Sequence, residues 1–277
     1  MMLRKDFCIF ILTHGRPDNI LTLKALEKAG YTGELFLVCD DDDKELERYK
    51  ANYGDRVKVF HKAESFDIMD GIVSHEYQSF PVYARNECFK IAKELGYRYF
   101  LQLDDDYQCF KLRYEQGGVL KSKNMKQMDT VCEAMLKLLD AGITCVAFAV
   151  QGDMIGGLKQ YRKGLIWQAK NCFFCDTEKA FTFLGRINED VTTPLRYNAV
   201  GKMFLTTMGV MIQMLPNEKN DGGSTEQYKA SSLYWNFSYP LLMCPGAYKV
   251  GVTAKGMNRR ISHDNAHPKI LSDTWKK

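Results

Sequence analysis

The sequence predicts an α/β fold in which helices flank a mostly parallel sheet. Two observations lead to this class: short, continuously apolar runs recur along the first 150 residues, and amphipathic helical segments separate them. A run that is apolar throughout is typical of a strand buried on both faces. The 277 residues are 45% hydrophobic and 26% charged, which excludes disordered, collagen-like and disulfide-scaffold proteins. A chain of this length can bury a large core without disulfides or metals.

Each expected element follows from its own residues. The strands are expected, in chain order, at residues 7–13, 34–39, 56–60, 99–103 and 144–150. The helices are expected at residues 19–29, 44–53, 82–95 and 124–141. Gly30 and Gly96 mark two helix ends, because glycine readily adopts the left-handed conformation that closes a helix. Residues 152–234 follow a looser pattern, so we expect one domain over residues 1–277 with an irregular C-terminal half.

Neither a membrane segment nor a secretion signal is expected. No run approaches the roughly 18 apolar residues of a membrane span, and the apolar run after residue 6 reads as a first strand. Most of the nine cysteines lie within apolar runs, as buried thiols do, which favours a reducing cytoplasm. Cys172 and Cys175 have the spacing of zinc ligands, but no second Cys or His pair accompanies them.

Three acidic or polar clusters follow expected strands, at residues 13–18, 40–43 and 104–106. In an open parallel sheet, ligands bind in the crevice at the carboxyl ends of the strands. Asp104 and Asp106 point the same way from an extended segment, so both could reach one hard divalent ion. The alternatives are a solvated turn for residues 40–43 and an Asx-type turn for residues 104–106.

Two further polar stretches could contribute to a site. Arg85 lies in the first turn of an expected helix, where it could bind an anion or make a surface pair with Glu87 or Asp104. The segment Gly185–Asp190 places carboxylates between apolar neighbours. A carboxylate held in a cleft there could serve as a general base.

Taken in order, these segments resemble the motifs of a nucleotide-sugar-dependent GT-A glycosyltransferase. The resemblance covers about residues 7–201 and implies a GT-A-like, Rossmann-related fold. It also implies a nucleotide-sugar-binding half at residues 1–110 and an acceptor-binding half at residues 111–277. The matching residues are Thr13 with Arg16, Asp40, Ala84-Arg85-Asn86, Asp104-Asp105-Asp106, and Glu189-Asp190 followed by Arg196 and Gly201.

The resemblance implies a UDP-sugar as the donor. Asp40 would accept hydrogen bonds from the uracil or ribose, Thr13 and Arg16 would line the same pocket, and Arg85 would lie near the diphosphate or the acidic loop. The residues expected to bind the nucleotide sugar are therefore Thr13, Arg16, Asp40, Arg85, Asp104 and Asp105.

A divalent cation, Mn²⁺ or Mg²⁺, is also implied. Asp104 and Asp106 would hold it between the two phosphates, with Asp106 as the direct ligand, and the ion would offset the charge that builds on the departing UDP. Many GT-A enzymes add a late histidine ligand, for which His263 is favoured over His267. The alternative for both histidines is a polar C-terminal turn.

The same resemblance assigns catalytic roles to the acids of the Gly185–Asp190 segment. Asp190 would be the base that deprotonates the acceptor hydroxyl in an inverting displacement. Glu189 would be its neighbour or its substitute.

The net charge of +4 conceals an uneven distribution of basic residues. Basic clusters with aromatic residues among them suit a polyanion whose bases can stack, although solvated loops also carry ordinary lysines. One cluster lies in the C-terminal tail, one follows the acidic 104–106 segment, and one lies beside Tyr161 and Trp167. Their members are Lys249, Lys255, Arg259, Arg260, Lys269, Lys276 and Lys277; Lys111, Arg113, Lys121, Lys123 and Lys126; and Lys159, Arg162 and Lys163.

The whole chain is similar to the phage TET-associated glycosyltransferases that modify DNA. The similarity is carried by Thr-His-Gly-Arg-Pro from residue 13, Leu-Asp-Asp-Asp-Tyr from residue 103, and Gly-Arg-Ile-Asn-Glu-Asp from residue 185. It implies DNA containing 5-hydroxymethylcytosine, or a related hydroxymethylpyrimidine, as the acceptor, in the cytoplasm of a phage host. The target base would leave the duplex at a cost of a few kcal/mol, with Tyr107, Tyr161 and Trp167 as the residues that could stack on it.

Other functions remain open at this point. A GT-A glycosyltransferase acting on a protein or a polysaccharide would share every motif above. A nucleotidyltransferase would want a Gly-rich, Lys-containing loop after the first strand, and a non-enzymatic nucleic-acid-binding module would not need carboxylates at strand ends. We expect a monomer with no membrane partner.

Overall fold

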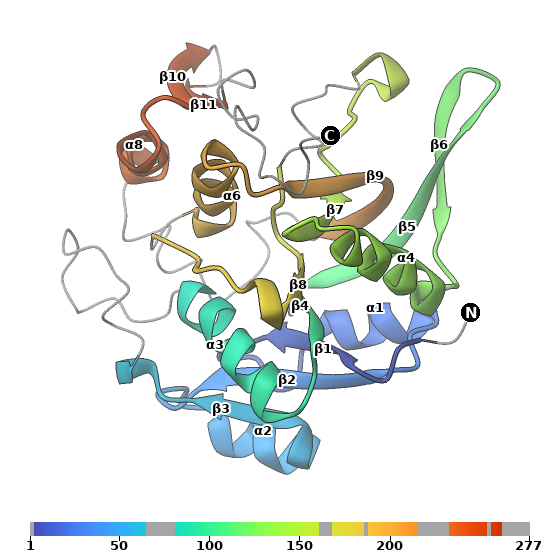
Figure 1. Cartoon of the computed structure of the whole chain (residues 1–277), viewed down its shortest axis with the longest axis vertical. Helices are drawn as coiled ribbons and strands as arrows, with labels where there is room; N and C mark the ends of the chain where they lie inside the picture. The colour runs from blue at the N-terminus through green and yellow to red at the C-terminus, as the bar shows by residue number, and fades with distance from the viewer. Residues whose placement is uncertain are drawn as a thin grey trace.

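The computed structural model describes residues 3–64, 81–160, 168–185, 188–214, 233–253 and 256–261, and a nine-stranded sheet forms its centre (Figure 1). The strands lie in the order β3-β2-β1-β4-β8-β7-β9-β5-β6. Their bounds are β1 Phe7–Leu12, β2 Glu34–Asp40, β3 Val57–Phe60, β4 Tyr99–Asp104, β5 Tyr107–Gln116, β6 Val119–Asn124, β7 Cys145–Val150, β8 Phe173–Asp176 and β9 Phe204–Met214.

Helices flank this sheet, which confirms the predicted α/β class. Helix α3 packs on β1, β2 and β4, whereas α1 contacts β5 and α4 contacts β7 and β8. A separate two-stranded sheet is formed by β10 Tyr248–Thr253 and β11 Gly256–Ile261. The helices are α1 Leu21–Ala29, α2 Leu46–Tyr53, α3 Pro81–Glu94, α4 Met128–Asp140, α6 Glu189–Ala199 and α8 Leu233–Met243, with 3-10 turns η1 Gly54–Arg56, η3 Gly157–Gln160 and η4 Thr177–Lys179.

Parallel pairing is concentrated in the N-terminal half of the sheet. The pairs β2–β3, β1–β2 and β1–β4 are parallel, as is β7–β9. The pairs β4–β8, β7–β8, β5–β9 and β5–β6 are antiparallel. The sheet as a whole is therefore mixed, and the expected parallel arrangement describes β3, β2, β1 and β4.

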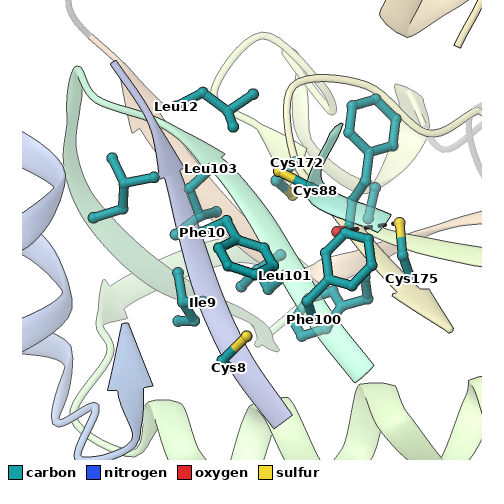
Figure 2. Close-up of a cluster of buried hydrophobic side chains, with 14 of the residues drawn as sticks. Cys8, Ile9, Phe10, Leu12, Cys88, Phe100, Leu101, Leu103, Cys172 and Cys175 are labelled. Carbon is teal, nitrogen blue, oxygen red and sulfur yellow. Dashed lines mark hydrogen bonds between the residues drawn. The ribbon is translucent and has the colours of Figure 1, made fainter. Parts of the chain in front are cut away.

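Strand β1 lies at the centre of the parallel half, and all six of its residues are buried. This burial explains why the segment is apolar throughout. Figure 2 shows Phe10 and Phe100 in the same apolar cluster, and their ring centroids lie 5.5 Å apart. The register of β1 with its neighbours places Leu12 beside Val38 and Asp104. The carboxyl end of this buried strand therefore lies next to the aspartate that ends β4.

The cysteines are core residues. All nine are free thiols and eight of them are buried. Figure 2 shows Cys8, Cys88, Cys172 and Cys175 among apolar side chains. The N–H of Phe148 donates to Sγ of Cys172 at 3.1 Å, and burial raises the pKa of that thiol to about 12. The prediction of buried thiols is confirmed, and Cys172 and Cys175 are buried directly before and within β8.

Gly30 ends helix α1, as expected. It has a φ of 78°, and its N–H donates to Glu27 O at 3.0 Å. A Cβ at this position would lie 2.7 Å from Lys126 O, so both the conformation and the close approach require glycine. Helix α4 begins at Met128, four residues later than expected from the 124–141 pattern, because β6 continues to Asn124.

The described parts of residues 152–234 include more regular structure than the looser pattern suggests. Strand β9 has eleven residues, and β5 and β6 form a hairpin that the sequence did not indicate. None of the helices in the described ranges has the length and apolar character needed to span a bilayer. The expected division into a donor-binding and an acceptor-binding half stays a prediction.

Candidate active site

The acidic clusters expected at strand ends meet at one edge of the sheet. Strands β2, β1 and β4 are adjacent and parallel, so their carboxyl ends share that edge. These ends are Asp40, Leu12 and Asp104. The loop after β1 is held to β2 by Thr13, whose N–H donates to Val38 O at 3.2 Å. The topology therefore brings together the three clusters that the sequence singled out.

Asp105 is buried and holds the loop that follows β1. Thr13 Oγ1 donates to Asp105 Oδ2 at 2.8 Å, and Arg16 Nη1 donates to Oδ1 at 3.0 Å. The hydroxyl of Tyr49 accepts from the N–H of Arg16 at 2.7 Å and lies 2.8 Å from Thr13 Oγ1. Burial raises the pKa of Asp105 to about 6, although Arg16 lowers it. Asp105 thus joins two of the predicted site residues, and Tyr49, which the sequence did not indicate, completes the network.

Arg85 joins two acidic motifs that are far apart in the sequence. Its side chain is 3% exposed, its Nε donates to Glu189 Oε1 at 2.9 Å, and its Nη2 donates to Asp104 Oδ1 at 3.1 Å. Burial lowers the pKa of Arg85, but the charges of Asp104 and Glu189 raise it by more. The guanidinium carbon also lies 5.1 Å from the ring centroid of Phe173. Arg85 therefore pairs with Asp104, one of the two partners considered, but it does so in a buried bridge to Glu189 rather than at the surface.

The residue after Arg85 supports the second motif. Asn86 Nδ2 donates to Phe183 O at 3.0 Å, and the N–H of Phe183 donates to Asn86 Oδ1 at 2.8 Å. The backbone of Arg85 is itself fixed, because Gln102 Nε2 donates to its carbonyl oxygen at 2.7 Å. The start of α3 thus positions the segment that leads to Glu189.

Two buried N–H donors lie beside the acidic loop without a partner. Among the described residues, Arg16 Nε and Arg85 Nη1 are buried and make no hydrogen bond. Buried donors are rarely left unpaired in folded proteins. Each arginine already binds an aspartate of the loop through another nitrogen, and an anionic ligand is one group that could satisfy such a donor.

Glu189 and Asp190 form the first turn of α6. Carboxylates are favoured there, because the N-terminus of a helix carries partial positive charge. Asn188, which precedes them, has a φ of 58° and a ψ of 32°, a left-handed conformation that asparagine tolerates better than most residues. Glu189 is buried and Asp190 is half-buried. Partial burial, together with the charges of Asp106 and Asp190, raises the pKa of Asp104. The three carboxylates are therefore close enough to repel one another electrostatically.

Glu189 is expected to make folding stability depend on pH. Burial, with the charge of Asp190, raises its pKa from 4.5 to about 7. Glu189 then binds a proton more tightly in the folded state than in the unfolded state. The stabilisation of the fold by this proton is fully present below pH 4.5 and is lost as the pH rises through 7. Relative to Glu189→Gln, the wild type should gain up to about 3 kcal/mol of unfolding free energy between pH 8 and pH 5.

Urea unfolding of both proteins across this pH range would measure the effect. Glu47→Gln is the matched control, since Glu47 also lies in the first turn of a helix but its side chain is 85% exposed. A wild-type advantage that stays constant with pH would contradict the prediction.

Asp40 belongs to a second polar network at the end of β2. His14 Nδ1 lies 2.8 Å from Asp40 Oδ2, and Lys62 Nζ donates to Oδ1 at 3.3 Å. Burial alone would raise the pKa of Asp40, but His14 and Lys62 lower it. Asp43 is buried as well and accepts from the N–H of Gly15 at 2.8 Å. His14 and Lys62 were not predicted, although His14 stands in the polar loop after β1 that the sequence had singled out.

One predicted role is wrong. Tyr107 was expected to stack on a target base, but its side chain is 0% exposed. Its hydroxyl donates to Asn171 O at 2.8 Å and lies 3.1 Å from Asp104 Oδ2. Tyr107 is the first residue of β5, where the strand enters the core, so it supports the acidic loop instead. Several predicted residues lie outside the described part of the chain, so their roles stay predictions. They are Tyr161, Trp167, His263 and His267, and the basic residues Arg162, Lys163, Lys255, Lys269, Lys276 and Lys277.

The acidic loop provides oxygen ligands for a cation but no complete protein cage. Among the described residues, no group of three His, Cys, Asp or Glu side chains could hold a metal ion. Asp104 is 30% exposed and Asp106 is half-buried. Mg²⁺ and similar ions often bind through one or two carboxylates and complete their coordination with substrate phosphates. The residues present therefore fit a cation that binds together with a phosphorylated ligand.

A family model described as TET-Associated Glycosyltransferase matches residues 7–223. The chain belongs to this family. The match confirms the resemblance drawn from the loop after β1, the acidic loop and the start of α6. No curated protein matches its sequence.

Solved structures similar to this TET-associated glycosyltransferase include three with distant sequences. Staphylococcus aureus TarS is 13% identical with a TM-score of 0.47, and the alignment covers 77% of this chain but 37% of TarS. GalNAc-T7 with UDP, GalNAc and Mn²⁺ is 13% identical with a TM-score of 0.49, covering 87% and 48% of the two chains. Mycobacterium tuberculosis glucosyl-3-phosphoglycerate synthase with Mg²⁺ and UDP is 9% identical with a TM-score of 0.48, covering 92% and 86%.

Proposed function

We propose that this enzyme transfers a sugar from a UDP-sugar to the hydroxyl of 5-hydroxymethylcytosine, or of a related hydroxymethylpyrimidine, in DNA. Membership of the TET-associated family supports the acceptor. The observation that carries the donor is the pair of buried arginines at the acidic loop. Arg85 and Arg16 are bound to Asp104 and Asp105, and each keeps a buried N–H donor. A diphosphate is an anion that both donors could bind.

The network around Asp40 supports recognition of the nucleoside. Asp40 is kept ionised, because His14 and Lys62 lower its pKa. An ionised carboxylate accepts hydrogen bonds from the N–H of uracil or from ribose hydroxyls. Asp40 ends β2, which pairs with β1, so such contacts would lie beside the loop that carries Thr13 and Arg16.

Asp104 and Asp106 would hold a divalent cation in this proposal. The metal would offset the negative charge of the UDP leaving group. The chain's own contribution is to keep Asp104 in place through Arg85 and Tyr107, and to hold Asp105 turned into the protein against Thr13 and Arg16.

Mn²⁺ should bind at least ten times more tightly when UDP is present. Two carboxylates are a weak site by themselves, and the phosphates would supply the missing ligands. Titration calorimetry of Mn²⁺ with and without UDP would measure this increase in affinity. Because coupling between two ligands is reciprocal, Mn²⁺ should increase the affinity for UDP by the same factor. Asp106→Asn should abolish both the coupling and metal-dependent turnover.

The matched control for this variant is Asp42→Asn, since Asp42 is an exposed acid in the loop after β2. Equal Mn²⁺ affinity with and without UDP would contradict the proposed ligands. Full activity of Asp106→Asn would do so as well.

Asp190 is proposed as the base that removes the proton from the acceptor hydroxyl. It is half-buried at the start of α6, and its charge acts on Asp104, so it lies within electrostatic reach of the proposed metal site. Glu189 is less suited to this role, because it is buried and bound to Arg85. A base acting opposite the departing UDP would invert the anomeric carbon.

Donor and acceptor can be tested together. The protein would be incubated with Mn²⁺, a panel of UDP-sugars and duplex DNA that contains 5-hydroxymethylcytosine, and the nucleosides would then be weighed by mass spectrometry. A nucleoside heavier by one sugar residue is the expected result. Hydrolysis of a UDP-sugar without modified nucleoside would confirm the donor and contradict the hydroxymethylpyrimidine acceptor, and a protein or a polysaccharide would then be tested as the acceptor.

A further inference from the structure

The hairpin of β5 and β6 starts at the candidate active site and leads away from it. β5 begins at Tyr107, directly after the acidic loop, and its ten residues extend over about 30 Å. Figure 1 shows the two strands as a long ribbon that projects from the body of the molecule. Gly117 and Gly118 form its turn, with φ values of 62° and 76°, as a two-residue hairpin turn requires.

One face of the ribbon is fixed to the body of the protein. Arg113 Nη2 donates to Asp153 O at 2.7 Å and to Val150 O at 3.0 Å, while its Nη1 donates to Met208 O at 3.4 Å. Glu115, on the same face, accepts from the N–H of Gly118 at 3.0 Å. These bonds hold the hairpin in one position relative to the end of β7.

The opposite face is aromatic and basic, and it is exposed except at Leu112, which is half-buried against the core. Residues opposite each other on paired strands share a face, and the register pairs Tyr114 with Lys121, Leu112 with Lys123, and Gln116 with Val119. Tyr114 is 40% exposed, and both lysines are exposed. The ammonium of Lys123 lies 5.9 Å from the ring centroid of Tyr114, and Lys121 Nζ donates to Gln116 Oε1 at 3.1 Å. We call this the Tyr114–Lys123 face.

Charge favours a polyanion as the partner of this face. Residues 107–126 contain five basic residues and one acidic residue. The acidic residue, Glu115, lies on the anchored face. The Tyr114–Lys123 face therefore presents lysines without a carboxylate among its paired residues.

We propose that the Tyr114–Lys123 face binds duplex DNA and presents it to the carboxylates at the base of the hairpin. A two-stranded ribbon fits the major groove of B-form DNA, and the lysines would contact phosphates on either side of it. This inference rests on the proposed DNA acceptor and adds the surface that holds the duplex. A competing explanation exists for these lysines. Lys121 and Lys123 lie on β6, an edge strand, and lysines on an edge strand can protect it from pairing with another sheet without binding any ligand.

Duplex binding without donor tests the inference directly. A fluorescent 30-base-pair duplex that lacks hydroxymethyl groups would be titrated with wild type, Lys121→Gln/Lys123→Gln, and Lys28→Gln/Lys93→Gln, between 50 and 200 mM salt. The last pair is the matched control, because Lys28 and Lys93 are exposed lysines on α1 and α3. UDP affinity would show that each variant is folded.

The hairpin variant should bind the duplex at least ten times more weakly at 50 mM salt. Its slope of log affinity against log salt concentration should be shallower by about 2, since each lost phosphate contact removes roughly 0.9. The control should match the wild type. With hydroxymethylated duplex as acceptor, the hairpin variant should raise KM and leave kcat within twofold.

Three outcomes would overturn the inference. The first is equal duplex affinity of the hairpin variant and the wild type. If that variant also self-associates, the lysines protect the edge of the sheet. The second is binding of the wild type to heparin, a polyanion without bases, but not to duplex DNA. The third is wild type that modifies a free hydroxymethyl nucleoside but does not bind duplex, which would remove the DNA-binding face and leave the proposed sugar transfer intact.

Discussion

Asp190→Asn should slow sugar transfer by a factor of about 10² to 10⁴, the usual contribution of a positioned general base. Asparagine keeps the size and the hydrogen-bonding shape of the side chain but cannot accept the proton of the acceptor hydroxyl. Binding of UDP should be unchanged, because the nucleotide contacts proposed above lie on other residues. Steady-state kinetics with hydroxymethylated DNA, together with calorimetric titration of UDP, would separate the two effects.

The matched control for Asp190→Asn is Glu47→Gln, which removes an acid from the first turn of α2. Both changes weaken an interaction with the partial positive charge of a helix N-terminus, so both should alter stability by less than about 1 kcal/mol. If Asp190→Asn binds UDP normally and turns over at the wild-type rate, Asp190 is not the base.

Arg85→Met should lower the free energy of unfolding by about 3–5 kcal/mol, the usual effect of removing one partner from a buried ion pair. Methionine fills much of the space but leaves Glu189 buried without its guanidinium partner. The side chains of Arg85 and Glu189 are 3% and 7% exposed, so water can do little to solvate the remaining charge. Urea unfolding at pH 8, where Glu189 of the wild type is ionised beside Arg85, would show the full effect.

The matched control for Arg85→Met is Arg48→Met. Arg48 also pairs with two carboxylates, those of Asp18 and Glu45, but its side chain is 58% exposed. Exposed pairs contribute between roughly 0 and 1 kcal/mol, so this variant should differ little from the wild type. A similar loss in both variants would show that the buried bridge has no special role.

Arg85→Met/Glu189→Gln provides a further test if the single variant is too unstable to study. Removing both partners leaves no unpaired charge at position 189, so the double variant should be more stable than Arg85→Met alone. Sugar transfer should remain impaired, because Asp104 would still lack the bond from Arg85 Nη2. A double variant less stable than both single variants would contradict this account.

Strands β1, β4 and β7 were predictable because they are buried almost throughout. Their segments are therefore apolar nearly throughout and cannot be mistaken for turns. β5 and β6 have one exposed face and carry several charges. Their sequence therefore resembles a polar loop, and the strand character becomes evident only from their pairing with each other and with β9.

The candidate site was predictable in its members but not in its connections. Asp104, Arg85 and Glu189 were each indicated by local motifs, yet the bond between Arg85 and Glu189 spans 104 positions. A single sequence carries periodicity and local turn chemistry, which do not specify contacts at that distance. Lys62 and Tyr49 were missed for the same reason, since each acts on a residue of another element.

The distribution of the thiols has a practical consequence. Cys109 is the one cysteine of the nine that is not buried, and it lies in β5, two residues after Tyr107. Reaction with maleimides or iodoacetamides requires an accessible thiolate, so Cys109 is the cysteine at which the native enzyme is expected to take up a dye first. A fluorophore there would lie at the start of the hairpin, three residues after Asp106, where it could report the arrival of nucleotide and of DNA without any engineered cysteine.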